Sequence, residues 1–100
     1  MTQRWKITVT LLPPKGITKE GKQVPAEYQR ELLRHLASMD PPPAKCLFSY
    51  GGENVAELLF FYNAATRFDA QLGADAMMKK LDEILATLKL RIDEFSVEES

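Results

Sequence analysis

Residues 4–11 alternate strictly between apolar and polar side chains, and this pattern constrains the fold more than any other feature of the chain. One side of the extended segment carries four large apolar residues, Trp5, Ile7, Val9 and Leu11. A period of two with β-branched residues is typical of a strand that buries one face. Two prolines follow at once and end the strand, because proline cannot donate to a sheet ladder. The rest of the chain must therefore cover one face of a sheet.

Two later segments repeat apolar residues at helical spacing. The first begins at Pro25, a favoured first helical position, and ends at Asp40, which three prolines follow. Its apolar side comprises Tyr28, Leu32, Leu33, Leu36 and Met39. The second follows Gly73, after an expected linker through Thr66 and Phe68. Its apolar side comprises Met77, Leu81, Ile84, Leu85 and Leu88.

Three further strands are predicted. Residues 45–50 alternate, and Gly51-Gly52-Glu53-Asn54 resembles a hairpin connection to a return strand over residues 55–63. The last strand covers residues 89–97. Phe95 and Val97 reach its inward face only if a β-bulge near Asp93 and Glu94 shifts the register. The acidic tail, residues 98–100, is expected to be flexible.

The order strand, helix, strand, strand, helix, strand predicts one α+β domain over residues 1–100. Two right-handed crossovers joined by a hairpin give a ferredoxin-like βαββαβ fold, a four-stranded antiparallel sheet with two helices on one face. An alternative remains open, because Leu58, Phe61 and Ala65 also fit a helical stripe. Residues 54–70 would then be helical, and three helices would cover a three-stranded sheet.

Composition narrows the class of function. Thirteen basic residues against 14 acidic ones give a net charge of −1, which argues against nucleic acid as a partner. The single cysteine excludes an intrachain disulfide and a cysteine-based zinc site. The start of the chain lacks the apolar core of a signal peptide, and no apolar run approaches the ~18 residues of a membrane span. We therefore expect a cytoplasmic protein that does not enter a membrane.

The candidate chemical groups favour ordinary structural roles. His35 lies one helical turn after Glu31, which permits an acid/base pair but is also usual on a helix surface. Cys46 falls on the predicted inward face, where a thiol is inert. The lysine-containing loop 15–24 lacks the spacing of a phosphate loop, and its role is left open. With no metal cluster, nucleophile motif or nucleotide fingerprint, we expect no cofactor and no enzymatic activity.

The outer face of the predicted sheet is the best candidate for a binding surface. The residues expected to form an interface or pocket there are Lys6, Thr8, Leu47, Glu57, Leu59 and Phe61. An exposed apolar patch surrounded by polar residues often marks an interface or a ligand pocket. The leading hypothesis is a non-catalytic interaction or regulatory module that binds a protein partner or a second copy of itself as a homodimer.

Two further hypotheses belong to other functional classes. A small cofactor-free enzyme of the dimeric α+β barrel type would enclose an apolar pocket between two stacked sheets, with Glu57 and Lys6 or Arg4 as its acid/base pair. An RNA-recognition domain would present aromatic residues on its first and third strands. Only Phe61 meets that requirement, and the glycine-bearing motif of such domains is absent, so RNA binding is disfavoured.

Overall fold

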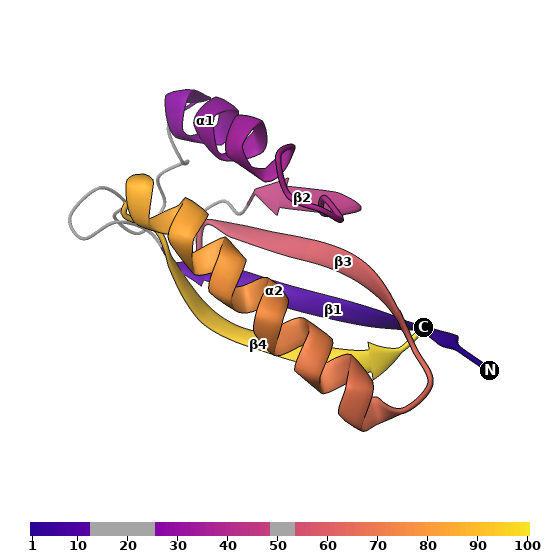
Figure 1. Cartoon of the computed structure of the whole chain (residues 1–100). Helices are drawn as coiled ribbons and strands as arrows, with labels where there is room; N and C mark the ends of the chain where they lie inside the picture. Colours follow the sequence, from indigo (N-terminus) through magenta and orange to yellow (C-terminus); the bar gives the residue numbers. More distant parts are fainter. Residues whose placement is uncertain (13–25, 49–53) are drawn as a thin grey trace.

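The computed structural model describes residues 1–12, 26–48 and 54–100, and it shows the predicted α+β architecture (Figure 1). The elements in chain order are β1 (Gln3–Leu12), α1 (Ala26–Leu36), β2 (Lys45–Phe48), β3 (Ala56–Ala64), α2 (Arg67–Thr87) and β4 (Arg91–Glu99). The predicted hairpin residues 51–53 and the lysine-containing loop 15–24 lie outside the described residues. Residues 56–64 form a strand, so the helical alternative for residues 54–70 is wrong over this stretch.

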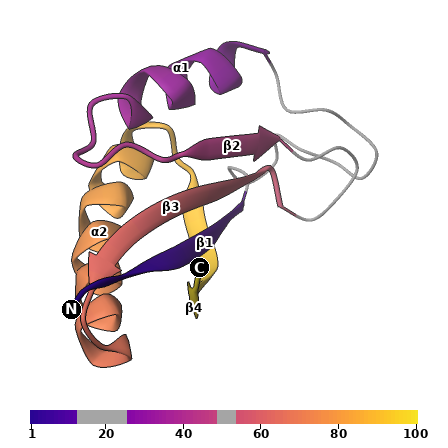
Figure 2. The same ribbon diagram turned by 90° about the vertical axis from the view of Figure 1, so that its right-hand side faces the viewer.

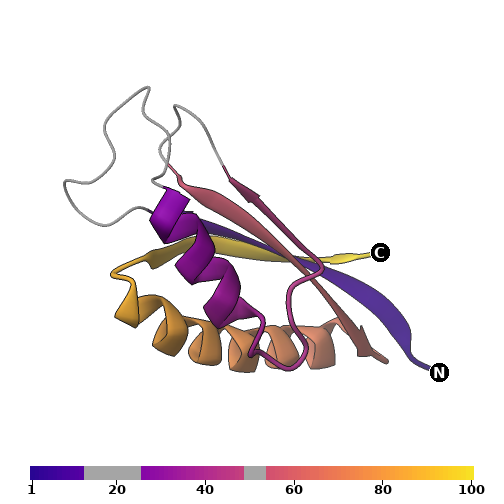
Figure 3. The same ribbon diagram turned by 90° about the horizontal axis from the view of Figure 1, so that it is seen from above.

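All the pairings in the sheet are antiparallel, and the strand order is β2-β3-β1-β4. This order and connectivity confirm the ferredoxin-like fold. Both helices lie on the same side of the strands (Figure 3), and the long helix α2 runs along one side of the sheet (Figure 2). Within the described residues, no helix lies over the other face of the sheet.

The core lies between β1, β3 and the helices. All four inward residues of β1 are buried, as the alternation predicts, and Leu58 and Phe60 of β3 are fully buried beside them. At one end of the sheet the Trp5 indole nitrogen donates a hydrogen bond to the Ala64 carbonyl, 3.1 Å away. The Arg67 guanidinium lies 5.3 Å from the centre of the Trp5 rings and donates to the Val97 carbonyl at 2.9 Å. These contacts join β1, β3, β4 and the start of α2.

Helix α2 begins at Arg67, so the prediction of a linker as far as Gly73 is wrong. The Thr66 side chain caps the helix by accepting a hydrogen bond from the Asp69 amide. Ala70 and Ala74 face the core in this early part of the helix and are fully buried. Short side chains there let the helix approach the sheet, and they give a weak apolar signal in the sequence.

Strand β4 contains the expected bulge. Thr10 pairs with Glu94 and Leu11 with Ile92, which leaves Asp93 without a partner of its own on β1. Beyond the bulge, Phe95 pairs with Val9 and Val97 with Ile7, so both point to the core.

The strand also continues past its predicted end, because Glu98 and Glu99 still pair with β1. The Ser100 amide donates to the Arg4 carbonyl at 3.1 Å. Residues 98–100, expected to be flexible, are thus bound to the central strand.

Helix α1 ends earlier than predicted, at Leu36, and a turn follows. Leu32, Leu36 and Met39 are buried, whereas Leu33 is 46% exposed and lies off the inward face. The peptide bond between Asp40 and Pro41 is cis. After this turn the chain enters β2 at the edge of the sheet.

The end of α2 places a lysine in the left-handed backbone region. Lys89 has a φ of 59°. Its amide donates to the Ala86 carbonyl at 3.2 Å, and the Leu90 amide donates to the Leu85 carbonyl at 3.0 Å. This is the Schellman arrangement, in which glycine is the usual residue at the left-handed position.

Replacing Lys89 by glycine should therefore stabilise the protein. Left-handed backbone costs a residue with a Cβ about 1–2 kcal/mol, which the greater chain entropy of glycine offsets in part. We expect the Lys89→Gly variant to gain about 1 kcal/mol of unfolding free energy in urea titration. The matched change Lys80→Gly, in the exposed middle of α2, should lose about 1 kcal/mol. Equal losses in both variants would contradict this account of the helix end.

Gly73 within α2 makes room for Tyr62 of β3. A Cβ at Gly73 would collide with ring carbons of Tyr62 and lie 2.8 Å from its hydroxyl oxygen. We expect Gly73→Ala to destabilise the wild-type chain by about 1 kcal/mol, because the ring must move. In a Tyr62→Ala background the same change should instead stabilise by about 1 kcal/mol, since alanine favours the helix. A double-mutant cycle measured by urea unfolding checks this, and additivity of the two changes would refute it.

Candidate functional site

The six residues predicted to bind lie on one face of three neighbouring strands. On this face Lys6 is opposite Phe61, and Thr8 is opposite Leu59. Leu47 is opposite Glu57 across the pairing of β2 with β3. The face is the one without helices, so the structure brings all six onto one continuous surface, which we call the open face.

An apolar diagonal crosses the open face. It consists of Leu47 on β2 followed by Leu59 and Phe61 on β3, and Leu47 is 58% exposed. Leu59 and Phe61 are half-buried between their neighbours on the adjacent strands. Side chains diagonal to one another on adjacent strands lie within reach, so the three form a continuous apolar strip.

Phe61 carries a cation on its ring. The Arg4 guanidinium carbon lies 4.4 Å from the ring centre, which is within the range of a cation–π contact. Arg4 is also held by a hydrogen bond from its Nε to the Ser100 hydroxyl at 3.2 Å. This contact orders the basic end of the open face.

A hollow of about 230 Å³ lies at the other end of the face. Its lining residues are Thr8, Thr10, Glu57, Glu94, Phe95 and Ser96. Thr10 pairs with Glu57 on one side and Glu94 on the other, so two carboxylates flank a central hydroxyl. The hollow offers oxygen acceptors and negative charge to a ligand.

The sequence pattern missed the part of this hollow that β4 supplies. Glu94 and Ser96 point outward because the bulge at Asp93 reverses the alternation after it. The signal available was the requirement that Phe95 and Val97 face inward, which places Glu94 and Ser96 on the opposite face.

Within one chain the structure does not bring Glu57 and Lys6 together. Glu57 is opposite Thr10, four residues along β1 from Lys6, which corresponds to about 13 Å of strand. Arg4 lies two residues farther away. Over the described residues, both ion pairs within 4.0 Å belong to α1 and leave Lys6, Glu57 and Glu94 without one.

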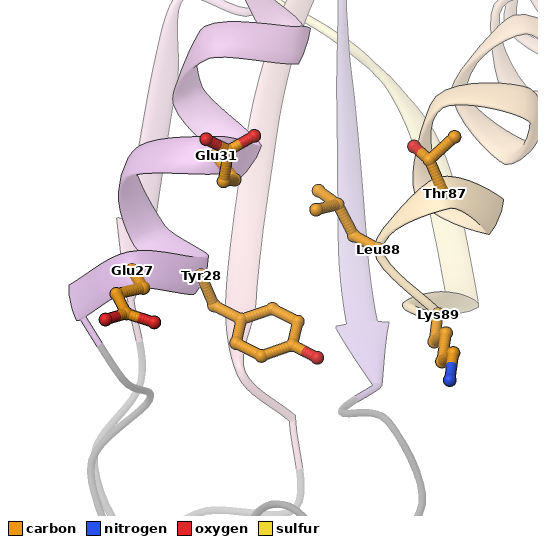
Figure 4. A pocket seen from close by; sticks show the side chains of 6 residues that line it. All are labelled: Glu27, Tyr28, Glu31, Thr87, Leu88 and Lys89. Atoms are coloured by element: carbon orange, nitrogen blue, oxygen red, sulfur yellow. The ribbon is translucent and has the colours of Figure 1, made fainter.

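A second crevice lies between the helices. Its volume is about 220 Å³, and its lining residues are Glu27, Tyr28, Glu31, Thr87, Leu88 and Lys89. Figure 4 shows the Tyr28 ring extending toward the end of α2 and Leu88 pointing back toward α1. Both side chains pack against the core, so we interpret the crevice as the packing seam between the two helices.

The possible acid/base pair of α1 is a surface cluster. Arg34 donates to the Glu31 carboxylate at 2.7 Å, and the His35 Nε2 lies 3.7 Å from the same oxygen. The hydrogen bond from Arg34 lowers the pKa of Glu31 below its usual value. Glu31 is thus an ionised partner of Arg34, and His35 lies beside the same carboxylate oxygen.

Neither a metal site nor a membrane span is found in the part of the chain that the structure describes. No three His, Cys, Asp or Glu side chains gather closely enough there to hold an ion. Neither α1 nor α2 combines the length and the apolar character needed to cross a bilayer.

Comparisons with protein-family models, with curated proteins and with solved structures find no match to this chain.

Cys46 should be a slow nucleophile. It lies on the inward side of β2 opposite Leu58, and burial raises the pKa of its thiol to about 11. Below pH 9 the thiolate fraction is then about a hundredfold smaller than that of an unperturbed thiol. We expect alkylation by iodoacetamide at pH 8 to be at least that much slower in the folded chain than in the urea-unfolded chain. Similar rates in both states would show that Cys46 is accessible and ionised.

Proposed function

We propose that this chain is a non-catalytic protein-interaction or regulatory module that binds its partner through the open face of the sheet. The observation that carries the proposal is the apolar diagonal on the face without helices. Its most exposed member, Leu47, is 58% exposed. Covering these side chains would remove apolar surface from water, which is the main driving force of protein association.

The surroundings of the diagonal favour a protein partner over a nucleic acid. The Phe61 ring is already occupied by Arg4, so it does not offer a free surface for stacking a base. Glu57, Glu94 and Glu98 add negative charge to the same face, which repels phosphate. A mixed surface with an apolar centre and a polar rim is instead typical of protein interfaces.

The geometry gives less support to catalysis. An enzyme of the stacked-sheet type needs an acid and a base beside an apolar pocket. The hollow of the open face is lined mainly by hydroxyl and carboxylate groups, and Lys6 lies about 13 Å along the strand from the row that contains Glu57. We expect the module to act in the cytoplasm, where its single thiol stays reduced.

Site-specific photocrosslinking tests the proposal. The photoreactive amino acid p-benzoylphenylalanine is placed at position 47 on the open face or, as a control, at position 79 on the exposed side of α2. After irradiation of cells that produce each protein, we expect covalent adducts from position 47 and few from position 79. Mass spectrometry then identifies the adduct. No adduct from position 47, or equal yields from both positions, would contradict binding through the open face.

A further inference from the structure

We propose that the partner of the open face is a second copy of this chain, bound face to face with its strands reversed, so that Lys6 of each copy enters the carboxylate-lined hollow of the other. This inference rests on the proposed function and names the occupant of the surface. The observation behind it is the distribution of charge along β1.

Along β1 and β3 the open face is basic at one end and acidic at the other, whereas β4 carries Glu98 opposite Lys6 and Arg91 opposite Leu12. Lys6 and Arg4 lie toward the start of β1, whereas Glu57 and Glu94 flank Thr10 toward its end. Thr8 lies midway, with Leu59 on one side and Ser96 on the other. Lys6 and Thr10 are thus equally spaced on either side of Thr8.

We place a two-fold axis midway between the two sheets, over the row that contains Thr8. The axis runs perpendicular to the strands, so the strands of one copy run opposite to those of the other. It places Lys6 of the second copy above Thr10 of the first, between Glu57 and Glu94. The lysine ammonium has three donors and no acceptor, which suits two carboxylates and a hydroxyl. The hollow of about 230 Å³ is several times the ~30 Å³ of one water molecule in the liquid, so the end of a lysine fits.

The same axis joins the apolar diagonals of the two copies. Leu59 lies on the axis and meets its own copy. Leu47 lies in the row of Thr10, and the reversal places this row over the row of Lys6 and Phe61 in the other copy. Leu47 of one copy therefore comes beside Phe61 of the other. The apolar contacts of the interface therefore lie on β2 and β3, and the Lys6–carboxylate contacts lie around β1.

The alternative face-to-face dimer, with its axis along the strands, is disfavoured. It would place each row against itself, and four carboxylates from Glu57 and Glu94 would meet. In the reversed arrangement three like-charge approaches remain: Lys45 meets its copy, Glu98 lies above Glu94, and Arg4 comes beside Arg91. These side chains are exposed, so solvent and salt screen the repulsion.

The area suffices for a weak but specific dimer. Three strands about 30 Å long and the four-residue strand β2, about 13 Å long, lie about 4.8 Å apart and give a face of about 500 Å² per copy. The total of about 1,000 Å² is at the lower limit for specific complexes, so we expect dissociation in the micromolar range. Stacked sheets pack with their strands about 30° apart, which this arrangement allows.

A charge-swap experiment tests the inference. Sedimentation velocity from about 1 µM to about 500 µM should show the wild-type chain changing from its 11.3 kDa monomer to twice that mass. Lys6→Glu and Glu57→Lys should each weaken the dimer at least tenfold, because each puts like charges together in both symmetry-related contacts. An equimolar mixture of the two variants should restore dimerisation, because every Lys6–Glu57 contact is again between opposite charges.

Matched controls separate this from general charge effects and from misfolding. Lys79→Glu and Glu83→Lys make the same charge changes on exposed positions of α2 and should leave the dissociation constant within about threefold of wild type. Lys6→Gln keeps most of the side chain without its charge and should weaken the dimer by an intermediate amount. Thermal unfolding followed by circular dichroism verifies that each variant is folded.

A wild-type chain that stays monomeric up to the highest concentration would overturn the inference, as would variants that dimerise like wild type or a mixture that does not recover. A monomer whose position 47 still crosslinks to another protein would refute the homodimer alone and leave the interaction module standing. If no adduct forms at position 47, the proposed function fails as well.

Discussion

Burial of the inward row of β1 is the constraint on which the rest of the structure depends. This strand is central, with β3 on one side and β4 on the other, and its four inward side chains lie beneath α2 and its neighbours. Removing these large apolar groups from water supplies much of the free energy that stabilises the core. Because a strand alternates, the same burial dictates that Lys6, Thr8 and Thr10 point the other way. The open face is thus a direct consequence of the core.

The contacts around Trp5 hold three strands and the start of α2 together at the end of the sheet where β1 begins. The indole nitrogen is satisfied by the Ala64 carbonyl, so a large polar-edged ring is buried without an unpaired donor. Arg67 reaches across from the start of α2 to the Val97 carbonyl and covers the ring. The segment between β3 and α2 is short, so these contacts lie at the first turn of the helix, which Thr66 caps.

Sequence periodicity was sufficient to predict most of the helices and strands. The alternation of β1, the aromatic and aliphatic density of β3 and the helical spacing of residues 77–88 each led to the element observed. The sequence pattern did not predict the start of α2, because glycine is typical of loops and Ala70 and Ala74 contribute little hydrophobicity to a helical pattern. Glycine is tolerated there because Tyr62 occupies the space of a side chain. That reason lies 11 residues away in sequence and is invisible to a local pattern.

The candidate surface was predictable in part, because side chains alternate between the two faces of a strand. Alternation alone assigns all six proposed residues to the open face, since each strand contributes every second residue. The hollow was not predictable, because its walls come from three strands whose register depends on how the loops align them. Which carboxylate lies opposite which hydroxyl follows from the pairing of Thr10 with Glu57 and Glu94.

The bulge at Asp93 is the one point of β4 where the strand can lose a residue without reversing its faces. One extra residue separates the part of the strand that begins with Arg91 from the part that carries Phe95 and Val97. Deleting Asp93 would join Ile92 directly to Glu94, and plain alternation would then keep Phe95 and Val97 inside and Glu94 and Ser96 outside. The same deletion farther along, at Ser96, would instead turn every later residue of the strand to the opposite face, so that Val97 would point outward.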